Sequence, residues 1–226
     1  MGHIVHTEAW GTVDLDTQRG HVLVRQDWRY HWTNDSNVPA WTPQERSAYH
    51  RAVDRLVWRY WSFHTFVEVR KTGANAGALA HFSGKGLTMS FDVHRVKVGG
   101  QWTVFVQKIR PDKRPRPRAE VWFQPRKIQL FSEDGKHVHA FRFMGDPART
   151  AEPNFYVAPH EFGHALGYGY ARGDGEERER ENPYFADTTS IMNMGQEVRP
   201  RHIRLIIETL RKMVPGVEFV ATGVMR

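Results

Sequence analysis

The residues best suited to chemistry lie in one short segment, in which His160 and Glu161 are followed by His164. On a helix, residues four apart lie one turn apart on the same face, so both imidazoles could reach one cation. Glu161 would lie beside that cation, where a carboxylate can take a proton from a water molecule that zinc polarises. The spacing therefore predicts two zinc ligands, His160 and His164, and one general base, Glu161.

The composition narrows the possible metal chemistry. The 226-residue chain contains no cysteine, which excludes thiolate ligands, disulfide bonds and cysteine nucleophiles. Any metal must then be held by His, carboxylate or Tyr side chains. No stretch approaches about 18 uncharged apolar residues, and the N-terminus lacks the basic and apolar regions of a signal peptide. We therefore expect no membrane span and no secretory signal peptide.

Charge is distributed unevenly along the chain. Lys and Arg number 32 against 25 Asp and Glu, which gives a net charge of +7. Cations dominate residues 108–118 and acids dominate 174–181, and such runs are typical of solvated loops. A basic chain can also attract nucleic acid or anionic envelope polymers. A non-catalytic nucleic-acid-binding domain that uses Lys108–Arg118 is therefore the alternative from a different class, although the eight tryptophans are too dispersed for a base-stacking platform.

A helix should begin near Thr42. Thr42 is a preferred N-cap residue, Pro43 suits the first helical position, and Glu45 completes a capping box. The helix should end near Ser62. Its expected inner face consists of apolar residues at three- and four-residue spacings, Ala48, Val53, Leu56, Val57 and Trp61.

Most of the remaining sequence before Pro147 predicts strands. β-branched and aromatic residues are enriched in 63–69, 87–93, 102–109, 120–131 and 137–143. Residues 133–136 contain the Asp-Gly of a hairpin turn, which should join the last two of these strands. The first 40 residues also read as short strands and turns.

Two further helices should follow, in 157–168 and 200–213. The second has an apolar stripe of Ile203, Ile206, Ile207, Leu210 and Val214. The expected strands and helices do not alternate regularly along the chain, as they do in a doubly wound fold, so we predict an α+β protein. Its parts are an N-terminal helix, a twisted mixed sheet, an active-site helix, a tight loop around Met192 and a C-terminal helix.

The sequence HEFGHALG at 160–167, followed by SIMNMG at 190–195, resembles the zincin metallopeptidases, and metzincins in particular. In metzincins a methionine turn lies beneath the metal, and Met192 fits that position. The resemblance is confined mainly to 157–210. It implies a zincin-like fold with one catalytic domain over 1–226, made of a sheet-containing subdomain (1–155) and a subdomain with the active-site and C-terminal helices (156–226).

The third ligand departs from the metzincin pattern. Metzincins place a His or Asp where this chain has Tyr170, and a phenol with a pKa of about 10 is a poor zinc ligand. Gluzincins take a Glu from a downstream helix, and Glu208 is the acidic residue well inside such a helix here. We therefore expect His160, His164 and Glu208 to bind Zn²⁺. The open alternatives are Tyr170, Asp174, Glu176, Glu177, Asp187 and His202.

A gluzincin-like ligand set with a metzincin-like methionine turn is similar to the metallopeptidase domains at the C-terminus of VgrG-type spike proteins of type VI secretion. This resemblance implies an antibacterial effector that is exported without a signal peptide and acts on peptides in the target-cell periplasm. A spike-protein fusion and a cognate immunity protein would be its partners. A peptidoglycan-peptide amidase that uses the same zinc chemistry is the alternative enzyme.

Overall fold

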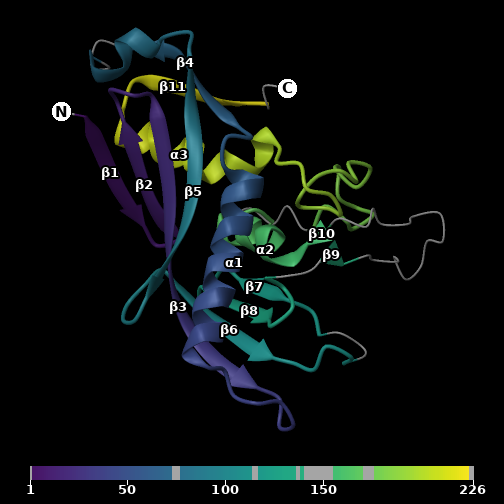
Figure 1. Cartoon of the computed structure of the whole chain (residues 1–226). Coiled ribbons are helices and arrows are strands. Elements are labelled where there is room, and N and C mark those ends of the chain that lie inside the picture. Colours follow the sequence, from purple (N-terminus) through teal and green to yellow (C-terminus); the bar gives the residue numbers. More distant parts are fainter. Residues whose placement is uncertain are drawn as a thin grey trace.

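The computed structural model describes residues 2–72, 77–113, 117–135, 138–139, 155–169 and 176–223. These residues form one large mixed sheet, a separate two-stranded sheet and three α-helices, which confirms the expected α+β class (Figure 1). None of the described helices is long and apolar enough to cross a membrane.

The sheet is organised around one long strand, β3 (His21–Asn34). Its first half pairs antiparallel with β2 (Gly11–Asp16), which in turn pairs with β1 (His3–Glu8). Its second half pairs in parallel with β6 (Trp102–Lys108) along the same edge. The opposite edge of β3 pairs in parallel with β5 (Gly86–Val96). Strand β3 therefore connects the two halves of the described sheet: β2 and β5 pair with its first half, and β6 pairs with its second half.

Shorter strands complete both ends of the sheet. Beyond β6 lie β8 (Lys127–Phe131) and β7 (Glu120–Trp122). Beyond β5 lie β4 (Phe66–Thr72) and β11 (Val217–Thr222), each antiparallel to its neighbour. The sequence patterns did not predict β11, which carries the C-terminal region into the same sheet as the expected N-terminal subdomain.

The first helix, α1 (Pro43–Trp61), begins as predicted. The amide of Glu45 donates to Oγ1 of Thr42 over 3.2 Å, and the amide of Thr42 donates to Oε2 of Glu45 over 2.8 Å. The buried face differs from the expected one, because Ala48 is exposed and Leu56 only half-buried. A four-residue row faces the core instead, consisting of Tyr49, Val53, Val57 and Trp61. Tyr49 belongs to the buried face because its ring contacts those of Trp32 and Trp41.

The predicted hairpin around Asp134 and Gly135 is not formed. The strand β8 lies between β6 and β7, and β9 (Val138–His139) pairs with β10 (Phe155–Tyr156). Gly135 lies against α1, where an added Cβ would be 3.4 Å from the ring of Tyr49. Packing under the helix, rather than local turn propensity, therefore sets the path of this segment. Residues 140–143 of the predicted strand lie outside the described residues.

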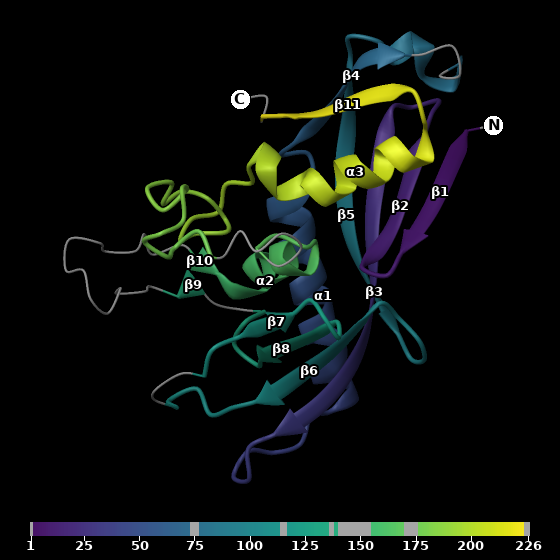
Figure 2. The ribbon, with the colours of Figure 1, turned by 180° about the vertical axis from the view of Figure 1, so that it is seen from behind.

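The other helices follow the predicted patterns. A 3-10 turn, η2 (Pro200–Ile203), leads into α3 (Arg204–Met213), and the predicted apolar stripe is buried. Helix α3 crosses the strands β2 and β5 in the view of Figure 2. The helix α2 (Val157–Ala165) lies beside α1, with Phe162 in ring contact with Trp61.

Candidate metal centre

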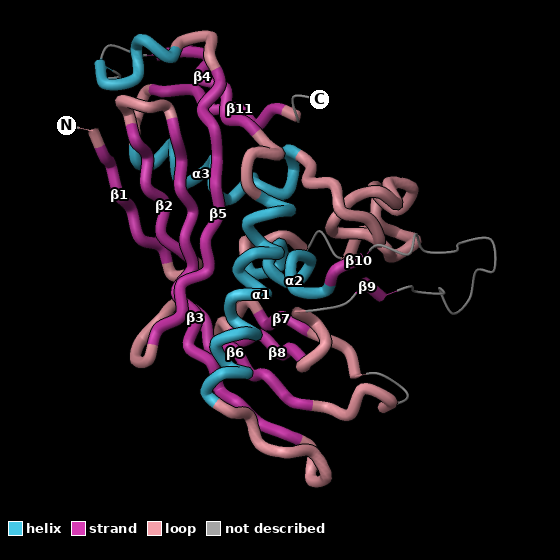
Figure 3. The backbone as a smooth tube through the Cα atoms, viewed as in Figure 1, coloured by secondary structure: helices cyan, strands magenta, loops and turns pink. Residues whose placement is uncertain are grey.

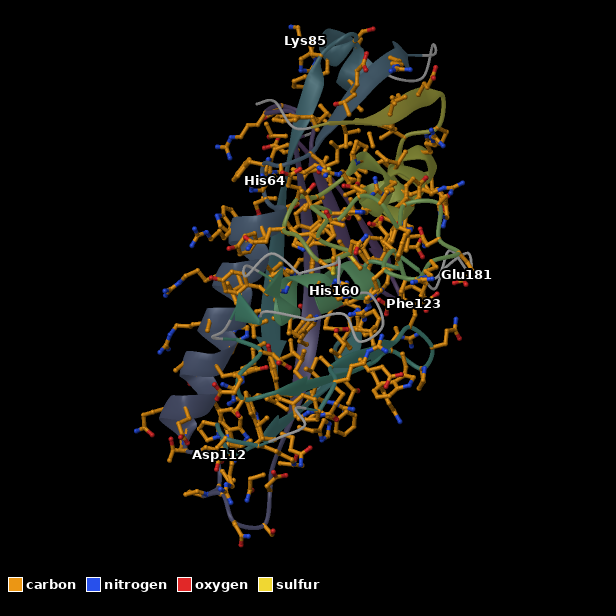
Figure 4. The ribbon with its side chains drawn as sticks, turned by 90° about the vertical axis from the view of Figure 1, so that its right-hand side faces the viewer. His64, Lys85, Asp112, Phe123, His160 and Glu181 are labelled. Carbon is orange, nitrogen blue, oxygen red and sulfur yellow. The ribbon has the colours of Figure 1, made fainter. Side chains whose placement is uncertain are left out.

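The candidate ligands His160 and His164 lie on α2, which is buried along its whole length. Phe162 anchors the helix because its ring contacts those of Trp28, Trp61 and Phe91, which come from β3, α1 and β5. The opposite side of the helix carries His160, which Figure 4 shows on α2 near the middle of the molecule. The central strands and α1 thus fix the direction in which the two histidines point.

The end of α2 is a glycine-dependent stop. Gly167 has a φ of 92°, a backbone conformation that favours glycine. Its amide donates to the carbonyl of His164, and the amide of Tyr168 donates to the carbonyl of Gly163, which together form a Schellman motif. The chain reverses here, and the carbonyl of Tyr168 returns toward the ring of His164.

Two backbone carbonyls determine which imidazole nitrogens carry protons. Nδ1 of His160 lies 2.7 Å from the carbonyl oxygen of Ile191, and Nδ1 of His164 lies 3.0 Å from that of Tyr168. A carbonyl oxygen can only accept, so both Nδ1 atoms must donate. In the neutral rings the two Nε2 atoms then present lone pairs, and they face each other at 3.2 Å. Two facing lone pairs require a proton or a metal cation between them.

Glu176 supplies the third group. Its carboxylate oxygens lie 3.4 Å from Nε2 of His164 and 3.8 Å from Nε2 of His160. Zinc bonds of 2.0–2.2 Å in a tetrahedron place ligand atoms about 3.4 Å apart, so these separations fit a zinc ion. Oε2 of Glu176 is also buried and receives no hydrogen bond within the described part of the chain, although Nη2 of Arg178 lies 2.9 Å away. The oxygen thus already faces one cationic group and lies where a metal cation could be bound.

The electrostatics support the same interpretation. Burial lowers the pKa of His160 to about 4. Burial would also lower the pKa of His164, but Glu176 and the charge of Glu161 outweigh it and raise the pKa. Although burial opposes ionisation of Glu176, its contacts with both imidazoles hold its pKa well below the ordinary value. The group therefore favours a positive charge among its three members.

Glu161 is buried beside this group without belonging to it. Burial raises its pKa to about 7, although the nearby charges of His164, Arg178 and Arg118 favour ionisation. A carboxyl that titrates near neutral pH can accept and release a proton, which is the property of a general base.

The turn around Met192 lies directly beneath α2. Met192 is fully buried, and a Cβ on Gly163 would be 2.2 Å from its sulfur atom. Only a glycine at 163 permits this approach, which also brings the carbonyl of Ile191 to His160. Met192 therefore packs closely against the helix that carries both histidines.

The structure does not bring Glu208 to the histidines. Its carboxylate faces Nε of Arg204 at 3.7 Å on the outer side of α3, one helical turn away. Within the described residues, the group that could hold a metal contains His160, His164 and Glu176. Glu176 therefore replaces Glu208 as the candidate third ligand, because its carboxylate lies beside both imidazoles whereas α3 presents its apolar stripe, and not Glu208, to the core.

The remaining candidates have other places. Tyr170 and Asp174 lie outside the described residues. Glu177, Asp187 and His202 belong to a neighbouring hydrogen-bond network rather than to the ligand group.

Sequence reasoning named Glu176 among the alternatives but favoured a solvated loop for the acidic run. Figure 3 shows the described chain between α2 and η2 as a loop, as expected. The expectation that the acidic run is solvated is wrong for Glu177, which is fully buried, and for Glu176, whose side chain is only 15% exposed. The signal that could have identified Glu176 is the place of the acidic run in the sequence. In sequence this run lies between the histidine helix and the turn around Met192, and both of those elements contribute to the candidate metal centre through His160, His164 and the carbonyl of Ile191.

The basic segment 108–118 is partly neutralised by ion pairs. Lys108 pairs with Glu45, Arg110 with Asp112 and Lys113 with Asp35. Arg118 pairs with Glu176 itself, over 3.0 Å. The end of this segment therefore lies at the candidate metal centre.

Comparison of the chain with protein-family models, curated proteins and solved structures finds no match.

Proposed function

We propose that this chain is a zinc-dependent metallopeptidase in which His160, His164 and Glu176 bind the ion and Glu161 is the general base. The convergence of two Nε2 lone pairs and a carboxylate at 3.2–3.8 Å carries the proposal. Three protein ligands leave a fourth position for water, as in catalytic rather than structural zinc sites.

The chemistry follows from this arrangement. A bound zinc ion would lower the pKa of a water molecule to about 7 and polarise the carbonyl group under attack. Glu161 would take a proton from that water as the water oxygen bonds to the carbonyl carbon, and would deliver it to the nitrogen released when the C–N bond breaks. Its own pKa near 7 suits both directions of transfer. The carbonyls of Ile191 and Tyr168 keep the histidines in the ligating tautomer, as second-shell groups do in zinc sites.

The local architecture supports a zincin-like assignment of the fold. A histidine helix ends at a glycine, a buried methionine turn lies under it, and a mixed sheet with one long helix flanks it. We infer from the resemblance to VgrG-type domains that the peptidase is an antibacterial effector, exported without a signal peptide, that acts in the target-cell periplasm and has a cognate immunity protein.

One observation favours the second enzyme candidate, a peptidoglycan-peptide amidase. Arg118 and Arg178 both contact the carboxylate of Glu176, and the side chain of Arg118 is 69% exposed. A divalent cation would add to their positive charge, which favours substrates that carry carboxylates close to the scissile bond. Peptidoglycan stem peptides have that chemistry. The nucleic-acid alternative has less support because the described cations of 108–118 are ion-paired.

The ligand set can be tested by zinc content. We expect purified wild-type protein to hold one zinc ion, and Glu176→Gln to lose it as His164→Ala does. Glu208→Gln is the matched control, because it removes the same charge from a residue outside the group. If Glu176→Gln retained zinc and Glu208→Gln lost it, the third ligand would be Glu208 rather than Glu176.

The reaction can be tested on the same preparations. Zinc-loaded Glu161→Gln should keep its metal and lose about 10²- to 10⁴-fold in activity, because it loses only the general base. Parallel assays with a protein substrate and with peptidoglycan fragments would distinguish the two enzymes. Wild-type activity in Glu161→Gln would refute the mechanism.

A further inference from the structure

A fully buried carboxylate, that of Glu177, lies next to the candidate ligand Glu176 in the chain. Its side chain has no exposed area. Tyr168 donates a hydrogen bond to it over 2.5 Å, and Arg201 donates two, over 2.6 and 3.1 Å. Nε2 of His202 lies 3.2 Å from the same carboxylate. Burying a charge is costly unless it is paired and hydrogen-bonded, and here it is both.

The first partner connects Glu177 to His164. Tyr168 follows the glycine stop of α2, and its hydroxyl binds Glu177 while its carbonyl accepts the proton of Nδ1 of His164. One residue thus contacts both the carboxylate of Glu177 and a metal-ligating imidazole.

A second path connects Glu177 to His160. Nε2 of His202 lies 3.3 Å from Oγ of Ser190, and that oxygen accepts a hydrogen bond from the amide of Met192. Ile191, between these two residues, supplies the carbonyl that binds His160. The carboxylate of Glu177 is therefore linked to the supports of both imidazoles.

The same carboxylate anchors the chain that carries the third ligand. The described residues 176–199 form turns without a regular helix or an extended strand, so no ladder of backbone hydrogen bonds holds Glu176 in place. The ion pair of Glu176 with the exposed Arg118 contributes little, as solvent-exposed pairs generally do. Arg178, whose side chain is 20% exposed, adds a second ion pair over 2.9 Å. The hydrogen bonds of Glu177, one residue away, add a restraint that is fully buried.

We propose that Glu177 is a positioning residue, which sets the separation between the carboxylate of Glu176 and the two histidines by tying their three supporting segments together. The inference rests on the proposed metal centre. Arg201 extends the network outward, because it also donates to Asp187 over 2.6 Å, and Asp187 accepts from Arg199 as well.

Zinc affinity is the first measurement, by competition with a chromophoric chelator. Glu177→Gln keeps the shape of the side chain and removes its charge, and we expect it to weaken zinc binding by about 10- to 100-fold, the range for second-shell partners. Glu179→Gln is the control, because it makes the same charge change at an exposed site two residues away. It should bind zinc as wild type does.

A spectroscopic measurement separates positioning from simple stabilisation. Cobalt(II) at full occupancy should give visible bands of different intensity in Glu177→Gln, because the ligand geometry has changed. If Glu177→Gln fails to fold, Tyr168→Phe removes one hydrogen bond to Glu177 while it keeps the carbonyl that supports His164. We expect weaker zinc binding and altered cobalt bands in that variant too.

Two outcomes are distinguishable. If the wild type binds no zinc through His160 and His164, the proposed metal centre fails. If the wild type binds zinc, and the folded variants match it in affinity and cobalt spectrum, only the positioning role of Glu177 is overturned.

Discussion

Replacing Gly163 by alanine tests the close packing of the methionine turn under the histidine helix. An added Cβ would be 2.2 Å from Sδ and 3.1 Å from Cε of Met192, and 2.9 Å from Cζ2 of Trp61. Both neighbouring side chains are fully buried, so neither can move into solvent. The substitution must therefore displace the buried side chains of Met192 and Trp61, or the turn and the helix that carry them.

The size of the effect follows from two opposing contributions. Alanine favours a helix interior over glycine by about 1 kcal/mol. Overpacking a core costs typically about 1–3 kcal/mol, and contact with two buried residues places this site at or above the upper end. We expect a net loss of about 2 kcal/mol, or about 4–8 °C in Tm for a chain of this length.

Urea unfolding followed by tryptophan fluorescence, with chelator present, would measure this loss without the contribution of metal binding. Gly77→Ala is the control, because an added Cβ there meets nothing within 4 Å. Combining Gly163→Ala with Met192→Ala should cost less than the sum of the two single changes, because the shortened side chain makes room. Wild-type stability of Gly163→Ala, or additivity in the double variant, would refute the packing argument.

Three other measurements test separate features. Zinc at about 1,000 times its Kd should add about 4 kcal/mol to the stability of the wild type and nothing to His164→Ala, as thermal unfolding with and without zinc would show. Burial lowers the pKa of His50 to about 4, so its contribution to stability is complete above pH 6.5 and declines as the pH falls toward 4. Allowing for its partial exposure, we expect His50→Gln to reduce the pH-dependent loss by about 1–2 kcal/mol in urea titrations at pH 7.5 and 4.5, and equal losses would contradict this. Expression with a periplasmic signal should slow bacterial growth for the wild type but not for Glu161→Ala, whereas equal growth would remove the envelope-toxin proposal and leave the zinc chemistry intact.

The parts of the fold that could be predicted are those determined by neighbouring residues. Thr42, Pro43 and Glu45 specify the start of α1 because all three act within one helical turn. The stripe of α3 is visible because one helix face repeats every three or four residues. Strand neighbours depend on long-range contacts, so the parallel pairing of β3 with β5 and β6 leaves no local signal.

The candidate site shows the same division. His160, Glu161 and His164 share one helical turn, and their spacing can be read directly. Glu176 is twelve positions beyond His164, outside that helical turn, and its neighbour Glu177 is held by partners distant in sequence such as Arg201. Glu208 fitted a family pattern, but its spacing from Arg204 also fits an ordinary surface pair, which is the arrangement found.

The strand β11 has a consequence for the order in which the molecule assembles. It pairs with β4 across about 150 residues of chain, as in the bond from Oγ1 of Thr222 to the carbonyl of Phe66. During synthesis this edge of the sheet stays open until residue 222 has left the ribosome. The histidine helix, the acidic run and the methionine turn all lie between β4 and β11 in sequence. Closing that edge therefore encloses the segment that carries the candidate metal centre in a loop held at both ends by the sheet. Pairings at such separation fold slowly, so we expect the proposed zinc binding to appear with the slow phase of refolding rather than with early helix formation.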